Sequence, residues 1–226
     1  MIKAVIFDFD GTILDSETCG YEAFCDLYAE YGLELRLEEW ALCIGTHGGP
    51  FEPYDELEKR SGRKLDRAAL KDRYETELMN RSLKMELLPG VRETLEEARQ
   101  LGLRIGLASS SHRDWIDRHL EEKGIRGFFQ TIQTADDVEK VKPDPALYRQ
   151  AAAALGVRPE EAVAIEDSRN GLLGAKAAGL KAVVVPNPMT RHMDFESAGV
   201  DLVLDSLAGR KLRDILAQLE SAENAR

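Results

Sequence analysis

Short apolar runs that alternate with helical segments are the feature that most constrains how this chain can fold. The runs after residue 87 are too short for helices and end at polar or turn residues; they are Leu103–Ala108, Phe129–Thr134, Ala162–Ile165, Ala182–Val185 and Leu202–Leu204. Helical segments lie between them; Pro145, for example, is placed to open a helix that Gly156 ends. Strands alternating with helices favour a parallel sheet that helices cover on both faces. We therefore expect an α/β fold with a doubly wound parallel sheet.

The first strand of this sheet is expected at the N-terminus, with a helical region inserted directly after it. Residues Lys3–Asp8 have the same apolar texture as the later runs, whereas residues 16–86 read as helices without a strand-like run. A glycine-rich break, Gly45–Pro50, falls between two of these helices. We expect a Rossmann-like core domain, residues 1–15 and 87–226, with an inserted helical cap domain, residues 16–86. The two connections between such domains suit a lid over a site.

Two pairs of acidic residues follow strands of the predicted sheet. Asp8 and Asp10 follow the first strand, and Glu166 and Asp167 follow the run Ala162–Ile165. Ligands of an open parallel sheet bind at the carboxyl ends of its strands, so both pairs should meet at one site. Like charges this close cost free energy unless a cation offsets them. Carboxylate oxygens suit Mg²⁺, and the sequence therefore predicts Mg²⁺ bound by these acids.

Groups that suit an anion follow two other strands. Ser109 begins a run of small hydroxyl side chains at the start of a helix, and Lys142 stands beside a proline on a loop. A cation, an anion pocket and a carboxylate nucleophile together indicate phosphoryl transfer. Asp8 would attack phosphorus, and Asp10 would protonate the leaving oxygen and later activate water. Taken alone, the serines would be helix caps and the lysine a solvated side chain.

The overall charge and composition limit the partners and the location of the protein. The formal net charge is −11 and no run of Lys or Arg stands out, so we expect no binding to nucleic acid or to acidic membranes. No apolar stretch approaches the roughly 20 residues of a membrane span, and the first residues do not read as a signal peptide. Three cysteines without a CxxC pair argue against a disulfide framework and against a zinc site. We expect a cytoplasmic monomer that acts on a small molecule.

Four motifs, in order along the chain, resemble those of a known family. DFDGT, LASSS, VKPDP and IEDS, with a helical region inserted after the first, resemble the motifs of the haloacid dehalogenase (HAD) superfamily. The resemblance covers essentially the whole chain and is closest to the β-phosphoglucomutase-like branch of phosphatases with a helical cap. It implies a Mg²⁺-dependent phosphatase that works through an aspartyl-phosphate intermediate.

The resemblance implies a role for each matching position. Asp8 would be the nucleophile, Asp10 the general acid and base, and Ser109 and Lys142 would bind the phosphoryl group. Asp10 would contact the metal through its backbone carbonyl. The implied metal ligands are Asp8, Asp10, Glu166 and Asp167. An acid at position 10 also favours phosphate esters over haloacids, because an alkoxide leaving group needs a proton and a halide does not.

The cap loop would choose the substrate. The resemblance assigns this part to the loop that contains Thr46, His47 and Gly48. β-Phosphoglucomutase carries a histidine shortly after the first motif and an arginine in this loop. In this chain the position that matches the histidine is Gly20. We therefore expect a phosphatase acting on a small phosphomonoester, such as a sugar phosphate, and keep a β-phosphoglucomutase-type hexose-phosphate mutase as the alternative.

Two further function classes fit the chain less well. A phosphoacceptor signalling domain would also hold Mg²⁺ beside an aspartate, but such domains are shorter and have no inserted helical region. A catalytically inactive binding protein is disfavoured because the acids and the lysine are all in place. Near the motifs, we expect His112 and His119 to be surface or groove residues and Trp115 a packing residue, with Ser110 and Ser111 serving as helix caps.

Overall fold

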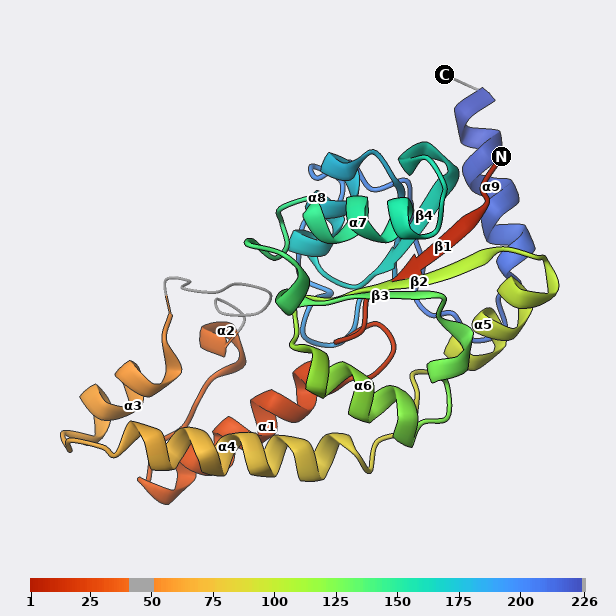
Figure 1. Ribbon diagram of the computed structural model, residues 1–226. Helices are drawn as coiled ribbons and strands as arrows, with labels where there is room; N and C mark the ends of the chain where they lie inside the picture. Colours follow the sequence, from red (N-terminus) through yellow and green to blue (C-terminus); the bar gives the residue numbers. More distant parts are fainter. Residues whose placement is uncertain (41–50, 225–226) are drawn as a thin grey trace.

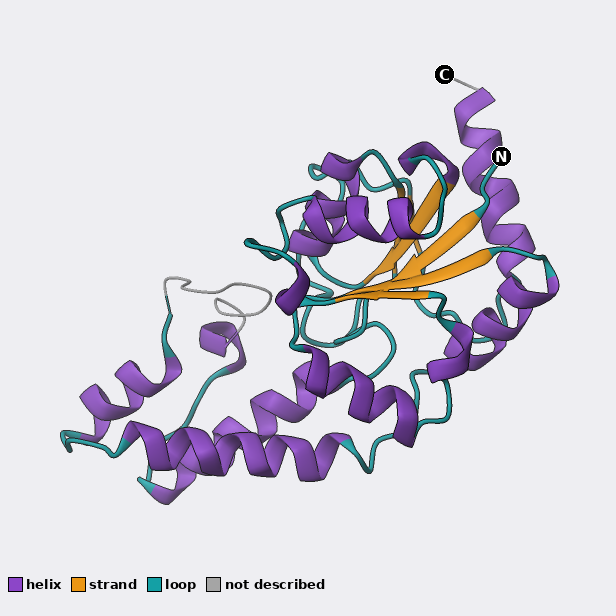
Figure 2. Cartoon of the chain, viewed as in Figure 1, coloured by secondary structure: helices purple, strands orange, loops and turns teal. Residues whose placement is uncertain are grey.

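A parallel six-stranded sheet forms the centre of the protein. The computed structural model describes residues 1–40 and 51–224. The strands are β1 Ala4–Phe7, β2 Arg104–Ala108, β3 Thr131–Gln133, β4 Ala162–Glu166, β5 Lys181–Val184 and β6 Leu202–Val203. Their order across the sheet is β3-β2-β1-β4-β5-β6, and every neighbouring pair is parallel (Figures 1 and 2).

Helices cover both faces of the sheet. Side chains alternate along β1: Val5 and Phe7 pack into one apolar cluster with α5, α6 and α9, while Ala4 and Ile6 pack into another with α7 and α8. These helices are α5 Val91–Gln100, α6 Arg113–Glu122, α7 Ala146–Ala154, α8 Arg169–Ala178 and α9 Leu212–Asn224. Three short 3₁₀ helices complete this part of the chain, η1 Arg126–Phe128, η2 Ala135–Asp137 and η3 Pro159–Glu161. The doubly wound α/β fold expected from the sequence is confirmed.

The chain between β1 and α5 forms a group of helices beside the sheet. They are α1 Ser16–Glu30, α2 Leu37–Trp40, α3 Pro53–Ser61 and α4 Arg67–Ser82. Figure 1 shows them together at the lower left, near the carboxyl ends of the strands. They share an apolar cluster of their own, to which Phe24, Tyr28 and Leu57 contribute buried side chains. Among the residues described, Met189 is the only buried residue from outside the group that joins this cluster.

The predicted strands all occur, and their ends differ from the prediction by at most two residues. The first is shorter than expected: it ends at Phe7, and the turn that leads to α1 begins at Gly11. The helix expected from Pro145 begins one residue later, with Pro145 as its N-cap. The predicted loop residues Thr46, His47 and Gly48 lie outside the described residues. None of the described helices has the length and apolar character to cross a membrane.

Candidate active site

The candidate site lies where the order of the strands reverses. From β1 the chain builds the sheet outward through β2 and β3, and then returns to place β4 on the other side of β1. Asp8 follows β1, Glu166 ends β4, and the backbone N–H of Asp8 donates to the carbonyl of Ile165 at 2.9 Å. This reversal, at the carboxyl ends of the strands, is where doubly wound sheets bind ligands. Both acidic pairs of the sequence therefore reach one place.

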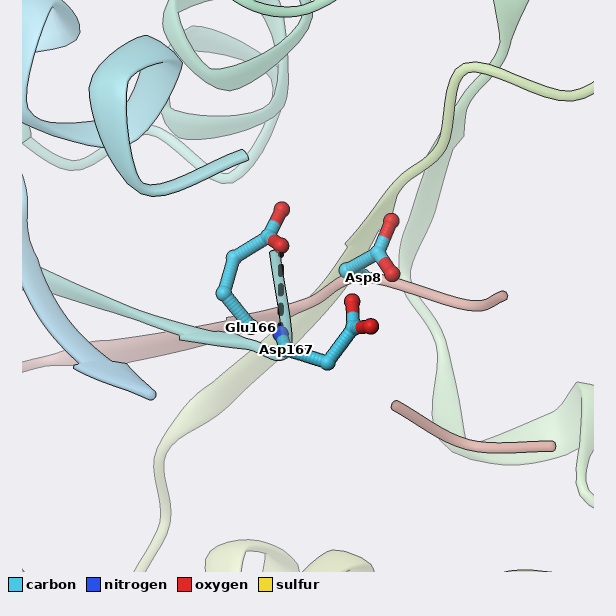
Figure 3. A group of neighbouring side chains, drawn as sticks. All are labelled: Asp8, Glu166 and Asp167. Atoms are coloured by element: carbon cyan, nitrogen blue, oxygen red, sulfur yellow. Dashed lines mark hydrogen bonds between the residues drawn. The ribbon is translucent and has the colours of Figure 1, made fainter. Parts of the chain in front are cut away.

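Three buried carboxylates form a cluster at this point. Oxygens of Asp8, Glu166 and Asp167 all lie within 4.8 Å of one another. Figure 3 shows the carboxylates of Asp8 and Asp167 converging from neighbouring strand ends. The exposed fractions of the three residues are 6%, 0% and 2%. Such a set of hard oxygen donors fits a divalent cation. Within the described part of the chain, the side chain of Asp10 does not belong to this cluster.

A buried lysine joins two of these acids. The Nζ atom of Lys142 donates to Oδ1 of Asp8, and to Oε1 of Glu166 at 2.7 Å. The hydroxyl of Tyr148 donates to the same oxygen of Glu166. The other oxygen of Glu166 accepts at 3.2 Å from the hydroxyl of Ser168, which is the N-cap residue of α8. Glu166 is thus held on both oxygens, and it holds Lys142 against Asp8.

Burial changes the protonation of this cluster. It raises the pKa of Asp8 to about 7, although Lys142 opposes the shift. Burial, followed by the charges of Asp8 and Glu166, raises the pKa of Asp167 well above its usual value. Burial alone would lower the pKa of Lys142, but the charges of Asp8 and Glu166 outweigh it and raise the pKa. Lys142 therefore stays charged at neutral pH, and a further cation would favour ionisation of Asp8 and Asp167.

Asp167 is oriented by groups from two loops. The side-chain N–H of Asn187 donates to Oδ2 of Asp167 at 2.7 Å, and the hydroxyl of Thr12 lies 3.4 Å from its Oδ1. Asn187 is itself fixed, because its Oδ1 accepts from the backbone N–H of Thr190 at 3.1 Å. Gly11 has a φ of +82°, and a Cβ atom there would overlap Asp167. The turn after β1 thus needs glycine to let the second acidic pair approach.

Asp10 has a different environment, made of neutral donors. The hydroxyls of Ser16 and Ser111 donate to its two oxygens, each at 2.6 Å. The indole N–H of Trp115 donates to Oδ1 at 3.0 Å, and the hydroxyl of Ser109 lies 3.5 Å from Oδ2. Asp8 and Asp10 therefore stand two residues apart but face different partners.

A cavity of about 300 Å³ opens between the sheet and the group of helices. Asp8, Asp10 and Lys142 lie on the sheet side, and Glu17 and Tyr74 lie on the helical side, from α1 and α4. Glu17 is partly buried, and burial, followed by the charges of Asp10 and Asp8, raises its pKa to about 8. The volume suits a small ligand.

The structure brings six of the predicted site residues to this cavity or its floor: Asp8, Asp10, Ser109, Lys142, Glu166 and Asp167. The sequence did not predict the contacts of Tyr148 with Glu166 and of Asn187 with Asp167, because only the folded chain brings these side chains together. The prediction was wrong about His119, which is fully buried, and it took Trp115 and Ser111 for packing and capping residues although both donate to Asp10. The only signal for Ser111 was its place in the serine run after β2.

A parallel sheet with an acidic cluster and a buried lysine at its reversal point is the arrangement expected of a HAD-like hydrolase. The chain belongs to that family: the model of the haloacid dehalogenase-like hydrolase family matches residues 5–185. The resemblance seen in the motifs is confirmed, and the protein is an enzyme of this hydrolase family.

Three proteins show how similar this chain is to other members of the family. A Bacillus subtilis (strain 168) protein named "Putative phosphatase YhcW" is 46% identical over 221 residues, 98% of this chain and 99% of that protein. The crystal structure of CbbY from Rhodobacter sphaeroides in complex with phosphate is 33% identical, with a TM-score of 0.74 over 92% of this chain and 96% of that one. That of a "putative beta-phosphoglucomutase" from Thermotoga maritima is 27% identical, with a TM-score of 0.77 over 90% and 94%.

Proposed function

We propose that the protein is a Mg²⁺-dependent phosphatase that hydrolyses a small phosphomonoester, such as a sugar phosphate, through an aspartyl-phosphate intermediate. The observation that carries this proposal is the contact of Lys142 with Asp8 beside Asp167, with Asp10 held separately by neutral donors. Such a site combines a nucleophile, a place for a cation, a fixed positive charge and an independent acid. The names of YhcW and of the phosphate complex of CbbY agree with it.

The donor set fits Mg²⁺. Asp8 and Asp167 would hold the ion with their carboxylates, and Asp10 would add its backbone carbonyl. Glu166 would complete the acidic shell, directly or through water, while its hydrogen bonds to Lys142 and Tyr148 keep the lysine in place. When bound, the ion would offset the repulsion between the carboxylates and a phosphate group.

The two aspartates at the end of β1 would carry the chemistry. An oxygen of Asp8 attacks phosphorus, the bond from phosphorus to the ester oxygen breaks, and Asp10 gives its proton to the departing alkoxide. Water then attacks the phosphorus of the aspartyl phosphate, and Asp10 takes the proton of that water. The bond between phosphorus and Asp8 breaks, which releases inorganic phosphate and restores the Asp8 carboxylate and the protonated Asp10.

Lys142 and Ser109 would bind the phosphoryl group. Both are buried, with exposed fractions of 6% and 1%, and both line the cavity next to Asp8. The positive charge of Lys142 attracts the phosphoryl oxygens at short range, although the chain as a whole carries a formal charge of −11. The hydroxyl of Ser109 can donate to the same group.

The helices between β1 and α5 would form a cap over this chemistry. We propose that residues 16–86 are the cap domain and residues 1–15 and 87–226 the core domain. The separate apolar cluster of α1–α4 and the cavity between these helices and the sheet support that division. The cap loop residues Thr46, His47 and Gly48 remain our proposal for substrate selection.

The mutase alternative has one observation in its favour, the structural likeness to the Thermotoga maritima protein. The geometry around Gly20 favours the phosphatase. A Cβ atom at position 20, where a mutase is expected to have histidine, would lie 2.9 Å from the hydroxyl of Tyr74. A side chain at this position would therefore need the Tyr74 side chain to shift.

One assay tests the proposal. Purified protein is incubated with sugar phosphates, phosphoglycolate, nucleotides and a chromogenic phosphate ester, with and without Mg²⁺. We expect phosphate release that needs both Mg²⁺ and Asp8, so that Asp8→Asn is inactive while the exposed control Asp214→Asn keeps full activity. Conversion of β-glucose 1-phosphate to glucose 6-phosphate with little free phosphate would replace the phosphatase by the mutase. Undiminished activity of Asp8→Asn would refute the mechanism.

A further inference from the structure

Trp115 makes a contact that simple packing does not require. It is partly buried in the first turn of α6, and its indole N–H points at Oδ1 of Asp10, 3.0 Å away. The other donors to Asp10 are serine hydroxyls, which can rotate about the C–O bond. An indole N–H has one fixed direction, because the ring that carries it is planar and rigid. The direction of the Asp10 carboxylate therefore depends on the position of this ring.

A buried histidine fixes the tryptophan ring. His119 lies one turn further along α6 and is fully buried, with its ring centroid 4.0 Å from that of Trp115. Its Nδ1 is 2.8 Å from the backbone carbonyl of Trp115, which can only accept, so Nδ1 carries a hydrogen. Burial lowers the pKa of His119, which keeps the ring neutral. Its Nε2 therefore accepts a hydrogen bond.

The donor to His119 comes from the end of the helical group. The hydroxyl of Ser82, the last residue of α4, lies 2.8 Å from Nε2 of His119. Ser82 has no exposed surface, so water does not compete for this contact. Phe9, the residue between the two aspartates, makes an edge contact with the histidine ring, at 5.8 Å between centroids. An unbroken series of contacts thus runs from Ser82 through His119 and Trp115 to Asp10.

We propose that Trp115 is a positioning residue that directs the Asp10 carboxylate toward the leaving-group oxygen, and that His119 and Ser82 hold its indole ring for this purpose. The proposal rests on the proposed function, in which Asp10 is the general acid. The end of α4, where Ser82 lies, then influences the direction of the Asp10 carboxylate. A carboxylate whose direction is fixed before the reaction transfers its proton more readily than one that rotates.

The test uses the identity of the leaving group. Departure of an alkoxide needs the proton of Asp10, whereas departure of 2,4-dinitrophenolate does not. For Trp115→Phe, which keeps an aromatic ring but loses the N–H, we expect kcat/KM for the best alkyl phosphate to fall by ~10- to 100-fold. The kcat/KM for 2,4-dinitrophenyl phosphate should change by less than about threefold. This ratio reports the steps up to formation of the aspartyl phosphate, so later hydrolysis does not enter it.

Two further variants keep the test decisive if Trp115→Phe folds poorly. Ser82→Ala removes the hydroxyl that contacts His119, together with its 3.1 Å contact with the backbone carbonyl of Met79 one turn earlier in α4. We expect a smaller loss, about 2- to 10-fold, again confined to the alkyl phosphate. In an Asp10→Asn background, Trp115→Phe should cause no additional loss, because the group that it positions no longer acts as an acid.

Several results would overturn the proposal. Equal losses with both substrates would make Trp115 a structural residue, and a further loss in the Asp10→Asn background would separate it from Asp10. An unchanged Ser82→Ala variant would remove His119 and Ser82 from the proposal. Full activity of Asp10→Asn on alkyl phosphates would instead refute the proposed mechanism itself, a result that does not depend on Trp115.

Discussion

Replacing Lys142 with methionine is the change that most directly probes the electrostatics of the site. Methionine keeps most of the apolar stem of the side chain but removes the charge. Lys142 is 6% exposed and contacts both Asp8 and Glu166, which are also buried. Removing the lysine therefore leaves two buried carboxylates without their cation. Breaking a buried ion pair in this way costs about 3–5 kcal/mol of the free energy of unfolding.

The loss should depend on pH in a direction that follows from Asp8. Its pKa is raised to about 7 in the folded protein even with Lys142 present, against about 3.9 in the unfolded chain. Between these values the folded state holds a proton that the unfolded state lacks, so the metal-free protein loses stability as pH rises through this window. Without Lys142 the pKa of Asp8 rises further. We thus expect the full loss at about pH 8 and a smaller one, about 1.5–3 kcal/mol, at about pH 5, where Asp8 is already protonated.

Urea unfolding of the metal-free protein at these two pH values measures the effect. Lys140→Met is the matched control, since Lys140 is exposed, and should stay within about 0.5 kcal/mol of the original protein. Adding Asp8→Asn to Lys142→Met should restore part of the stability at the higher pH, because one unpaired charge is then gone. A loss that is the same at both pH values, with no recovery in the double variant, would refute this account.

Two further predictions concern Glu166 and the metal. Gly171→Ala in α8 should lower stability by about 1–3 kcal/mol, because its Cβ would overlap the Glu166 carboxylate. In Gly174→Ala the new Cβ atom would lie 3.4 Å from its nearest neighbour, so stability should change by no more than about 1 kcal/mol. Thermal unfolding of the two variants measures the difference. Mg²⁺ should bind more tightly as pH rises through about 7, since Asp8 and Asp167 must lose their protons. Titration calorimetry in buffers of different ionisation heat measures this release, and equal heats in all buffers would contradict it.

The sheet could be predicted from the sequence because its signals are local. Each buried parallel strand is a short apolar run, such as Ala4–Phe7 or Ala162–Glu166, and each run ends where polar residues begin. The order of the motifs then brings Asp8 and Asp167 to one edge, since parallel strands end on the same side. Lys142 was predicted from its neighbours in sequence rather than from any property of an isolated lysine.

The residues that were missed act across distances that no local pattern encodes. Tyr148 reads as one apolar position of α7, yet its hydroxyl contacts Glu166. Asn187 sits in a loop after β5 and meets Asp167 only because β5 pairs with β4. His119 was expected to be a surface or groove residue. It is buried because the end of α4 packs against α6, a contact between residues 37 positions apart.

The separation of Asp8 from Asp10 is where the fold adds most to the motif. The sequence predicts different roles for these two acids but does not show which side chains surround each of them. In the structure Asp8 meets a lysine, which can only donate and stays charged, so its environment favours the ionised nucleophile once a cation is bound. Asp10 meets the hydroxyls of Ser16 and Ser111, which accept as well as donate and so can partner either protonation form. In the proposed mechanism Asp10 exchanges a proton, and its two serine partners allow that exchange.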